Sequence, residues 1–358
     1  MQDNIIGWDI GGANLKAACL TQSGTVLAVY QEYCPLWQGM QALEQALTKI
    51  LAKLPVQITQ HALTMTGELV DLFDNRAQGV QAIIVLMQKS LPQQSIAVYA
   101  GRLGFIKAAK VSVEHYDDIA SANWLASVSY VAQFIEQGLF VDIGSTTTDI
   151  VLLQNHQASV LGYTDFQRLT TGELVYTGLV RTAVMAVAQS VYFAGNEVGL
   201  MSEYFATMAD VYRLTDELKE QHDQSETADG QAKTSQASAQ RLARMLGCDV
   251  QDFTMQQWQQ LAYVIREQQL LRIQQASEKI LSRLDSRGNI VLIGAGVGRF
   301  LVQAVAQRLG FAYKDFSELF TAELVLENSN SKAMDVADCA PAVCVAYLSI
   351  KELATGSL

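Results

Sequence analysis

The stretch FVDIGSTTTDIVLL, residues 140–153, places two aspartates, a glycine and four hydroxyl side chains between two apolar runs. The apolar runs predict two strands, but a plain hairpin needs only a pair of turn residues such as Asn-Gly between them. Asp142 ends the first strand, where its carboxylate could hold a cation, and the hydroxyls could contact phosphate oxygens. The stretch therefore predicts a loop that binds a metal-bound phosphate group.

A related stretch lies at the N-terminus, IIGWDIGGANLKAACL, residues 5–20. Asp-Ile-Gly occurs at residues 9–11 and again at 142–144, each time at the end of an apolar strand. Thr-Gly-Glu-Leu also occurs twice, at 66–69 and at 171–174. Two repeated words in the same order indicate a duplicated α/β unit, with chance recurrence of such short words as the alternative.

Composition bounds the class of protein. The chain has 358 residues, of which 50% are hydrophobic and 17% charged, which predicts a globular protein of about two domains. Its net charge is −11 and it has no dense Lys/Arg run, so we expect neither nucleic acid nor a membrane as a partner.

The scattered cysteines and the start of the chain, which has no signal-peptide pattern, favour the cytoplasm. The four histidines show no metal-ligand spacing, so we expect no zinc site.

The first loop predicts a phosphate site of its own. A carboxylate repels phosphate unless a cation lies between them, so Asp9 implies Mg²⁺, which proteins usually hold through few side chains and several waters. Glycine lets backbone N–H groups approach phosphate closely, and a lysine adds a point charge. The alternative is an ordinary glycine turn. The expected phosphate-binding residues are Gly11, Gly12, Asn14 and Lys16.

The second loop carries hydroxyls where the first has Ala13 and Asn14. Asp142 is the expected metal or acid/base residue, whereas we interpret Asp149 as a strand or turn residue. Because threonine also suits strands, some of the hydroxyls could be purely structural. The expected phosphate-binding residues of this loop are Gly144, Ser145, Thr146 and Thr147.

A late glycine-rich turn, Gly294-Ala295-Gly296, lies between an apolar strand and a helix. One interpretation is a dinucleotide-binding turn with Asp315 contacting the ribose, although the glycine spacing differs from the usual fingerprint. Another is a clamp for a nucleotide or substrate. The third is a tight turn whose glycines serve packing alone.

The two Asp-Ile-Gly hairpins and the late Gly-Ala-Gly turn together resemble the actin/hexokinase/Hsp70 superfamily. There the hairpins are the two phosphate loops and the late glycines form the adenosine motif. The resemblance implies an α/β fold with two ribonuclease-H-like domains around a central cleft. We expect these domains at residues 1–135 and 136–358, with a helical insertion at about 195–285.

Nearly the whole chain resembles the hydantoinase/oxoprolinase-like proteins of the tetrahydromethanopterin-linked C1 transfer pathway, the methanofuran-biosynthesis synthase branch of that superfamily. The segments that carry the resemblance include GWDIGGANLKAA, SANWLAS, TTGELVYTGLVRTAV, TADGQAKT and GAGVGRFL. The resemblance implies a transferase that joins the phenol of γ-glutamyltyramine to an aminomethylfuran-methyl diphosphate and releases pyrophosphate. Its partners would be these small molecules, and the sequence does not indicate an oligomeric state.

This activity suggests roles for further residues. Mg²⁺ bound by Asp9 and Asp142 would neutralise the leaving pyrophosphate. The candidate bases for the phenol are Glu68 and Glu173, with a glutamate at a helix N-terminus as the structural alternative. The candidate substrate-binding residues, for a phosphate or for the glutamyl carboxylate, are Arg168 and Arg181, and Asp229 and Lys233 could cover the substrate from the 219–240 loop.

ATP chemistry is doubtful, because Ala13-Asn14 stands where nucleotide-hydrolysing relatives often carry Thr or Ser. The alternatives are an ATP-dependent kinase or ring hydrolase, and a nucleotide-gated switch without chemistry of its own.

Overall fold

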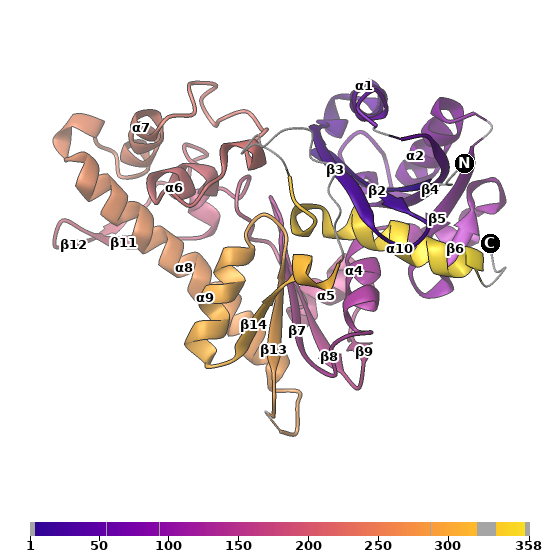
Figure 1. Ribbon diagram of the computed structural model, residues 1–358. Helices are drawn as coiled ribbons and strands as arrows, with labels where there is room; N and C mark the ends of the chain where they lie inside the picture. The colour runs from indigo at the N-terminus through magenta and orange to yellow at the C-terminus, as the bar shows by residue number, and fades with distance from the viewer. Residues whose placement is uncertain (1–3, 55, 93, 287, 321–333, 355–358) are drawn as a thin grey trace.

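The computed structural model describes residues 4–54, 56–92, 94–286, 288–320 and 334–354. Figure 1 shows two β-sheets with helices packed around them, and a lobe of helices to one side. Within the described part of the chain, none of the helices is both long and apolar enough to cross a bilayer.

The first sheet has the strand order β3-β2-β1-β4-β5-β6. Its first three strands are antiparallel neighbours, and β4 and β5 run parallel to β1. Every residue of β1 is buried, because helices cover both faces of the sheet. The bounds of the strands are β1 (Asn4–Ile10), β2 (Asn14–Thr21), β3 (Val26–Tyr33), β4 (Ile58–Met65), β5 (Ser95–Tyr99) and β6 (Phe105–Lys107).

The second sheet repeats this arrangement. β7 pairs antiparallel with β8, and β8 with β9, while β13 and β14 run parallel to β7. β8 pairs with both β9 and the short strand β10, and taken through β9 the order β9-β8-β7-β13-β14 matches β3-β2-β1-β4-β5. This confirms the predicted duplication and the two-domain α/β fold class. The bounds are β7 (Gln137–Ile143), β8 (Thr148–Gln154), β9 (Gln157–Ser159), β10 (Leu174–Val175), β13 (Val291–Ala295) and β14 (Ala312–Asp315).

The helices complete the layers. Helix α1 buries one face, made of four residues at helical spacing, Leu43, Ala46, Leu47 and Ile50. The bounds of the helices are α1 (Met40–Leu51), α2 (Arg76–Ser90), α3 (Tyr116–Ile119), α4 (Asn123–Val131), α5 (Asp165–Thr171), α6 (Met208–Leu214), α7 (Ser235–Met245), α8 (Met255–Leu281), α9 (Arg299–Leu309) and α10 (Ala340–Ala354).

Helix α10, at the end of the chain, packs on the first sheet. A Cβ atom added to Gly7 of β1 would lie 2.0 Å from the Ala342 carbonyl oxygen and 2.9 Å from the Ala346 Cβ, so only glycine permits this close approach. The C-terminal segment therefore returns to the N-terminal sheet. The domain boundaries expected from the sequence stay a prediction.

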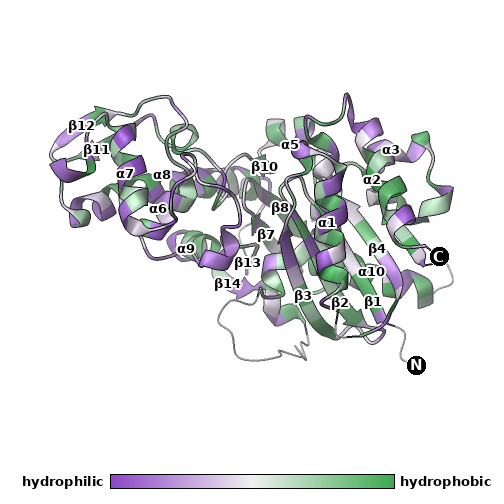
Figure 2. Cartoon of the chain, turned by 90° about the horizontal axis from the view of Figure 1, so that it is seen from above, coloured by the Kyte–Doolittle hydropathy of each residue, from purple (hydrophilic) through white to green (hydrophobic). Residues whose placement is uncertain are grey.

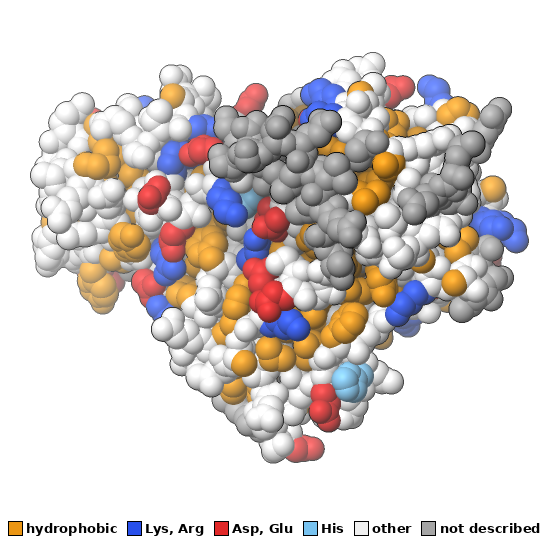
Figure 3. Space-filling view, viewed as in Figure 1, with side chains coloured by type: hydrophobic (Ala, Val, Ile, Leu, Met, Phe, Trp, Pro, Cys, Tyr) orange, Lys and Arg blue, Asp and Glu red, His pale blue; other side chains and the backbone are white. Residues whose placement is uncertain are grey.

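Helices α6, α7 and α8 form the lobe at one side, together with the hairpin of β11 (Ser190–Phe193) and β12 (Asn196–Gly199). Seen from above in Figure 2, this lobe stands apart from the sheets. On the face shown in Figure 3, acidic and basic side chains alternate along the seam between the lobe and the rest of the molecule.

Three breaks between elements shape the region around the second sheet. Helices α3 and α4 are separated at Ser121, whose φ is +53°. Helix α6 begins at Met208, because Thr207 caps it there. Strand β9 ends at Ser159 and is followed by α5.

Candidate functional site

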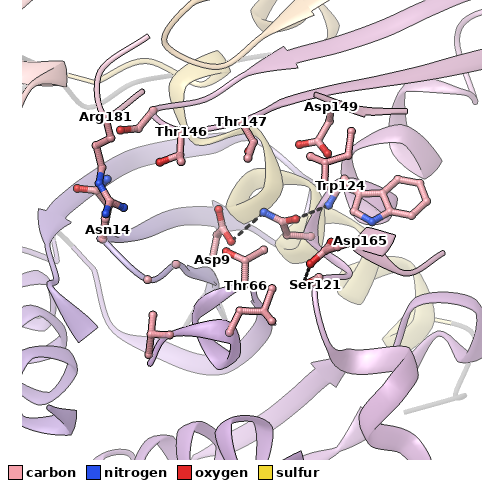
Figure 4. Close-up of a pocket in the computed structure, with 18 of the residues that line it drawn as sticks. Asp9, Asn14, Thr66, Ser121, Trp124, Thr146, Thr147, Asp149, Asp165 and Arg181 are labelled. Carbon is pink, nitrogen blue, oxygen red and sulfur yellow. Dashed lines mark hydrogen bonds between the residues drawn. The ribbon is translucent and has the colours of Figure 1, made fainter. Parts of the chain in front are cut away.

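Both Asp-Ile-Gly loops line one cavity of about 550 Å³ between the two sheets. Figure 4 shows Asp9 and Asn14 of the first loop opposite Thr146, Thr147 and Asp149 of the second. The cavity brings together most of the predicted phosphate-binding residues. Those that line it are Gly11, Gly12, Asn14, Lys16, Ser145, Thr146 and Thr147.

The two loops have the same backbone turn. The Gly11 N–H donates to the Asn14 carbonyl at 3.0 Å, and the Gly144 N–H donates to the Thr147 carbonyl at 2.9 Å. The segment 178–182 holds the second loop from behind, since the N–H groups of Val180 and Arg181 both donate to the Ser145 carbonyl. The repeated tripeptide therefore has the same structural position in each half.

The other repeated word, Thr-Gly-Glu-Leu, has a different structural position in each half. Residues 66–69 follow strand β4, but residues 171–174 end helix α5, where Gly172 adopts φ +85°. Glu173 therefore follows a helix rather than starting one. Its buried carboxylate accepts hydrogen bonds from the N–H groups of Leu161 and Gly162 and pairs with Arg283 at 2.9 Å. Glu173 is absent from the described lining of the cavity, so the geometry gives its expected role as a base no support.

Strand register places different partners opposite the two loop aspartates. Asp9 of β1 faces Lys16 of β2, whereas Asp142 of β7 faces Asp149 of β8. Burial alone would lower the pKa of Lys16, but Cys339 and the carboxylates of Asp9, Asp142 and Asp338 raise it above its usual value. Lys16 is thus a shared cation close to both loop aspartates.

Burial shifts the pKa of both loop aspartates in the same direction. Burial raises the pKa of Asp9 to about 6, although Lys16 and a hydrogen bond from Asn123 Nδ2 at 3.3 Å oppose this shift. Burial, and after it the Asp149 carboxylate, raise the pKa of Asp142 to about 7. A cation bound between such groups would favour their charged forms.

Asp142 itself is absent from the described lining of the cavity. A Cβ atom added to Gly296 would lie 2.3 Å from Asp142 Oδ1, so the late glycine turn packs directly against this carboxylate. Asp149 lines the cavity instead. The expectation that Asp149 serves only the strand is therefore incomplete, because β8 also presents its side chain to the site.

Asp149 belongs to a buried cluster with an arginine and a tryptophan. The Arg168 guanidinium donates to Asp149 Oδ1 at 2.7 Å and to the Glu173 carbonyl at 3.0 Å. It also lies 3.9 Å over the ring of Trp124. Burial raises the pKa of Asp149, and Arg168 opposes that shift. Arg168 lines the cavity, but its charge is already paired.

The donors around the cavity fit Mg²⁺ held mainly through water and phosphate. The described residues contain no cluster of three or more His, Cys, Asp or Glu side chains that could enclose a metal. Mg²⁺ commonly takes only one or two protein carboxylates and completes its shell with water and substrate phosphate. Asp9 and Asp149, with the hydroxyls of Ser145 and Thr146, supply such a set. Relative to the sequence prediction, Asp149 replaces Asp142 as the direct candidate.

Glu68 reaches the cavity only through Ser121. Its side chain is buried, and Ser121 Oγ donates to Glu68 Oε1 at 2.8 Å, while Glu68 Oε2 has no hydrogen-bond partner among the described atoms. Burial raises the pKa of Glu68, although the Ser121 hydrogen bond opposes the shift. Ser121 lines the cavity and also lies 3.3 Å from Asp165 Oδ2.

The late glycines contact protein rather than the cavity. A Cβ atom added to Gly294 would lie 2.7 Å from the ring of Tyr313, and Gly296 adopts φ +77° against the second loop. Gly294, Ala295 and Gly296 are all absent from the described lining. Asp315 pairs with Arg299 at 2.8 Å. These contacts support the packing interpretation of the turn.

The remaining predicted substrate residues separate into two groups. Arg181 lines the cavity and lies 5.0 Å over the ring of Trp37. Asp229 pairs with Arg241 at 3.0 Å, and Lys233 lies 3.3 Å from Asp223. Asp229 and Lys233 thus stabilise their own loop and are absent from the described cavity lining.

Sequence reasoning missed several cavity residues in one segment. Ser121 and Asn123 interrupt an apolar helical pattern just before Trp124, and this polar interruption was the available signal. Thr66 also lines the cavity and begins the first Thr-Gly-Glu-Leu word, whereas Asp165 lines it without a comparable pattern in the sequence.

Two curated relatives share sequence with this chain. A synthase of Methanocaldococcus jannaschii, named (4-{4-[2-(gamma-L-glutamylamino)ethyl]phenoxymethyl}furan-2-yl)methanamine synthase, is 32% identical over 277 residues, which cover 75% of this chain and 81% of the synthase. A protein of the same name from Methanococcus vannielii is 28% identical over 172 residues, or 47% of this chain and 75% of that protein.

Comparison with solved structures supports the fold. The nucleotide-free structure of acetone carboxylase superposes on 87% of this chain and 68% of that chain, with a TM-score of 0.55 and 11% sequence identity. The sequence model of the hydantoinase/oxoprolinase family matches residues 59–320. Because this match and the Methanocaldococcus jannaschii relative each span most of the chain, the protein belongs to the hydantoinase/oxoprolinase family.

Proposed function

We propose that this protein joins the phenol oxygen of γ-glutamyltyramine to the methylene carbon of an aminomethylfuran-methyl diphosphate and releases pyrophosphate. The observation that carries the proposal is the meeting of both Asp-Ile-Gly loops at one cavity, in a chain 32% identical to a synthase named for this ether product. The volume of about 550 Å³ falls within the usual range for small-molecule sites.

The loops are suited to hold the diphosphate. Backbone N–H groups of Gly12 and Ser145 and the hydroxyl of Thr146 would donate to phosphate oxygens, and Lys16 adds positive charge. When the carbon–oxygen bond breaks, its electron pair leaves with the pyrophosphate, and these donors stabilise the charge that develops there. Mg²⁺, held by Asp9 and Asp149, would neutralise part of the same charge.

The phenol must lose its proton as its oxygen bonds to the methylene carbon. Ser121 Oγ can accept that proton while it passes its own proton to Glu68 Oε1, 2.8 Å away. Burial raises the pKa of Glu68, and this makes the carboxylate a stronger base. Glu68 would therefore act through Ser121, because Ser121 is the one of the two that lines the cavity.

The direct test is incubation of the purified protein with both substrates and Mg²⁺. The proposal expects equimolar ether and pyrophosphate, detected by mass spectrometry and a phosphate-release assay. Absence of both products, with circular dichroism showing a folded protein, would sink the substrate assignment.

The proposed proton transfer from the phenol through Ser121 to Glu68 has its own test. Ser121→Ala and Glu68→Gln should each lower kcat about 10²- to 10⁴-fold, the usual contribution of general base catalysis, with a smaller change in KM. Glu173→Gln serves as the comparison, since Glu173 is absent from the described cavity lining. If Glu68→Gln keeps full kcat, the base lies elsewhere.

An ATP-dependent kinase or ring hydrolase and a nucleotide-gated switch remain alternatives. The contacts of Gly294 and Gly296 with protein give an adenosine site at that turn no support. Calorimetric titration separates the possibilities, because a kinase or switch should bind ATP more tightly than pyrophosphate.

A further inference from the structure

A second cavity of about 250 Å³ adjoins the first. The two share Trp37 and Arg181 in their linings. The second cavity extends from that shared wall toward the helical lobe, where Tyr204 and Arg213 line it. A long ligand could therefore have one end in each cavity, with the Trp37 ring beside its middle.

Arg181 differs from the other arginine at this cavity. Arg213 is paired with Asp223 at 2.6 Å and with Glu220 at 3.1 Å. Arg181, in contrast, forms no ion pair with any carboxylate in the described chain, and its guanidinium is held on the Trp37 ring at 5.0 Å. A planar guanidinium fixed in this way can bind a carboxylate through two parallel hydrogen bonds.

The rest of the second cavity is acidic and hydroxyl-rich. Its charged lining consists of the carboxylates Asp210, Asp223 and Glu226 and the guanidinium groups of Arg181 and Arg213. Asp210 is paired with Arg241 at 2.7 Å, and Asp223 is paired with Arg213 at 2.6 Å and with Lys233 at 3.3 Å, so these two carboxylates are already neutralised. Among the described residues the cavity thus offers one unpaired guanidinium and one unpaired carboxylate, which suits a zwitterion. Among the described residues Glu226 has no ion-pair partner, so it remains able to accept an ammonium group.

We propose that the second cavity binds the amino-acid head of the acceptor, the free α-carboxylate and α-ammonium of its γ-glutamyl group. Arg181 binds the carboxylate, Glu226 binds the ammonium, and Trp37 packs on the tyramine portion between the cavities. This assignment rests on the proposed function, because it takes the acceptor from there. It makes Arg181 a determinant of acceptor choice rather than a ligand of the diphosphate.

The experiment compares γ-glutamyltyramine with tyramine, which has the same phenol but no amino-acid head. For Arg181→Gln we expect kcat/KM for γ-glutamyltyramine to fall roughly ten- to a hundredfold relative to that for tyramine, the effect of a lost charged hydrogen-bond pair. Arg181→Lys should restore part of this preference, and Glu226→Gln should reduce it by less. Arg308→Gln removes an exposed ion pair between Arg308 on α9 and Glu267 on α8, and this matched control should leave the preference unchanged.

The outcomes separate the two proposals. If Arg181→Gln slows both acceptors equally, Arg181 acts on the diphosphate and the second-cavity assignment is wrong. If the unmodified protein forms ether from neither acceptor, the proposed function fails. Calorimetric titration then still tests the cavity, since γ-glutamyltyramine should bind the unmodified protein more tightly than tyramine does and lose that advantage in Arg181→Gln. Equal binding of the two amines by the unmodified protein would overturn the assignment.

Discussion

The two Asp-Ile-Gly loops share a backbone turn but differ in charge. Asp9 faces Lys16 across its hairpin, whereas the equivalent Asp142 faces Asp149. The first loop therefore neutralises its own carboxylate, and the second concentrates two carboxylates that Arg168 balances only in part. The duplication kept the backbone geometry of the loop and changed its charge, so in the proposed function the need for a cation falls on the second half.

The two loops also differ in their hydroxyl side chains, which occur only in the second loop. Ala13 and Asn14 of the first loop stand where the second has Thr146 and Thr147, and all four line the cavity. In both halves a glycine packs behind the loop, from the turn after β4 in the first half and from the turn after β13 in the second. A Cβ atom at Gly67 would lie 3.1 Å from the Ile10 carbonyl oxygen, and one at Gly298 would lie 3.3 Å from that of Ile143.

The largest expected effect comes from removing the cavity carboxylate of the first loop. Asp9→Asn should lower kcat/KM about 10²- to 10³-fold, because it removes charge at the point where the proposed metal-bound diphosphate would be stabilised. Asp142→Asn should cost clearly less, since Asp142 lies behind the loop against Gly296. Steady-state kinetics at saturating Mg²⁺ measures both, with exposed Asp74→Asn as the control. Equal losses in the two variants would show that Asp142 acts directly and that the loops are equivalent.

A large effect on stability should follow from filling the space behind the second loop. In Gly296→Ala the new methyl group would lie 2.3 Å from Asp142 Oδ1 and the residue would keep φ +77°. We expect the free energy of unfolding to fall by about 3 kcal/mol, the sum of backbone strain and a steric clash. Gly195→Ala is matched in φ, at +82°, but meets open space, and it should cost about 1 kcal/mol. Urea unfolding measures both, and similar losses would contradict the close packing at Gly296.

The third prediction concerns pH in the absence of metal. The pKa of Asp142 is raised from 3.8 to about 7, so the folded protein binds the proton more tightly than the unfolded chain does. Stability from this group is therefore greatest below pH 3.8 and is lost as the pH rises toward about 7. Asp142→Asn should consequently melt a few degrees above the unmodified protein at about pH 8 in EDTA, and the difference should vanish near pH 4.

The corresponding change in the first loop provides the comparison. The pKa of Asp9 is raised only to about 6, because Lys16 opposes the effect of burial. Asp9→Asn should therefore gain less thermal stability at about pH 8 than Asp142→Asn. A larger gain for Asp9→Asn in the same scanning calorimetry would show that Lys16 does not neutralise the first loop.

The smallest expected effect comes from making the second loop resemble the first. Thr146→Ala reproduces the residue at position 13 and removes one hydroxyl donor from the cavity. We expect pyrophosphate to bind up to about tenfold more weakly, as for the loss of one hydrogen bond to a charged group. Calorimetric titration measures the affinity, with exposed Thr170→Ala on α5 as the control. Unchanged affinity in Thr146→Ala would mean that backbone N–H groups alone hold the phosphate.

The sequence predicted the duplicated fold and the meeting of the two loops because each loop is a local pattern, an apolar strand that ends in Asp-Ile-Gly. It did not separate the roles of Asp142 and Asp149, since both are acidic residues of one hairpin. It was misled by the repeated Thr-Gly-Glu-Leu, because four identical letters follow a strand in one half and end a helix in the other.

The sequence by itself determined that each half contains an apolar strand that ends in Asp-Ile-Gly and leads into a second strand, since hydrophobic alternation and glycine act over a few residues. Only the tertiary structure decided which carboxylate faces the cavity. Gly296, far along the chain, packs on Asp142 and leaves Asp149 open to the site. The tertiary structure also decided that Arg168 forms an ion pair with Asp149 while Arg181 lies on the Trp37 ring and is available to a ligand. The sequence could not distinguish the two arginines, because the partner of Arg168 comes from a different element of the fold.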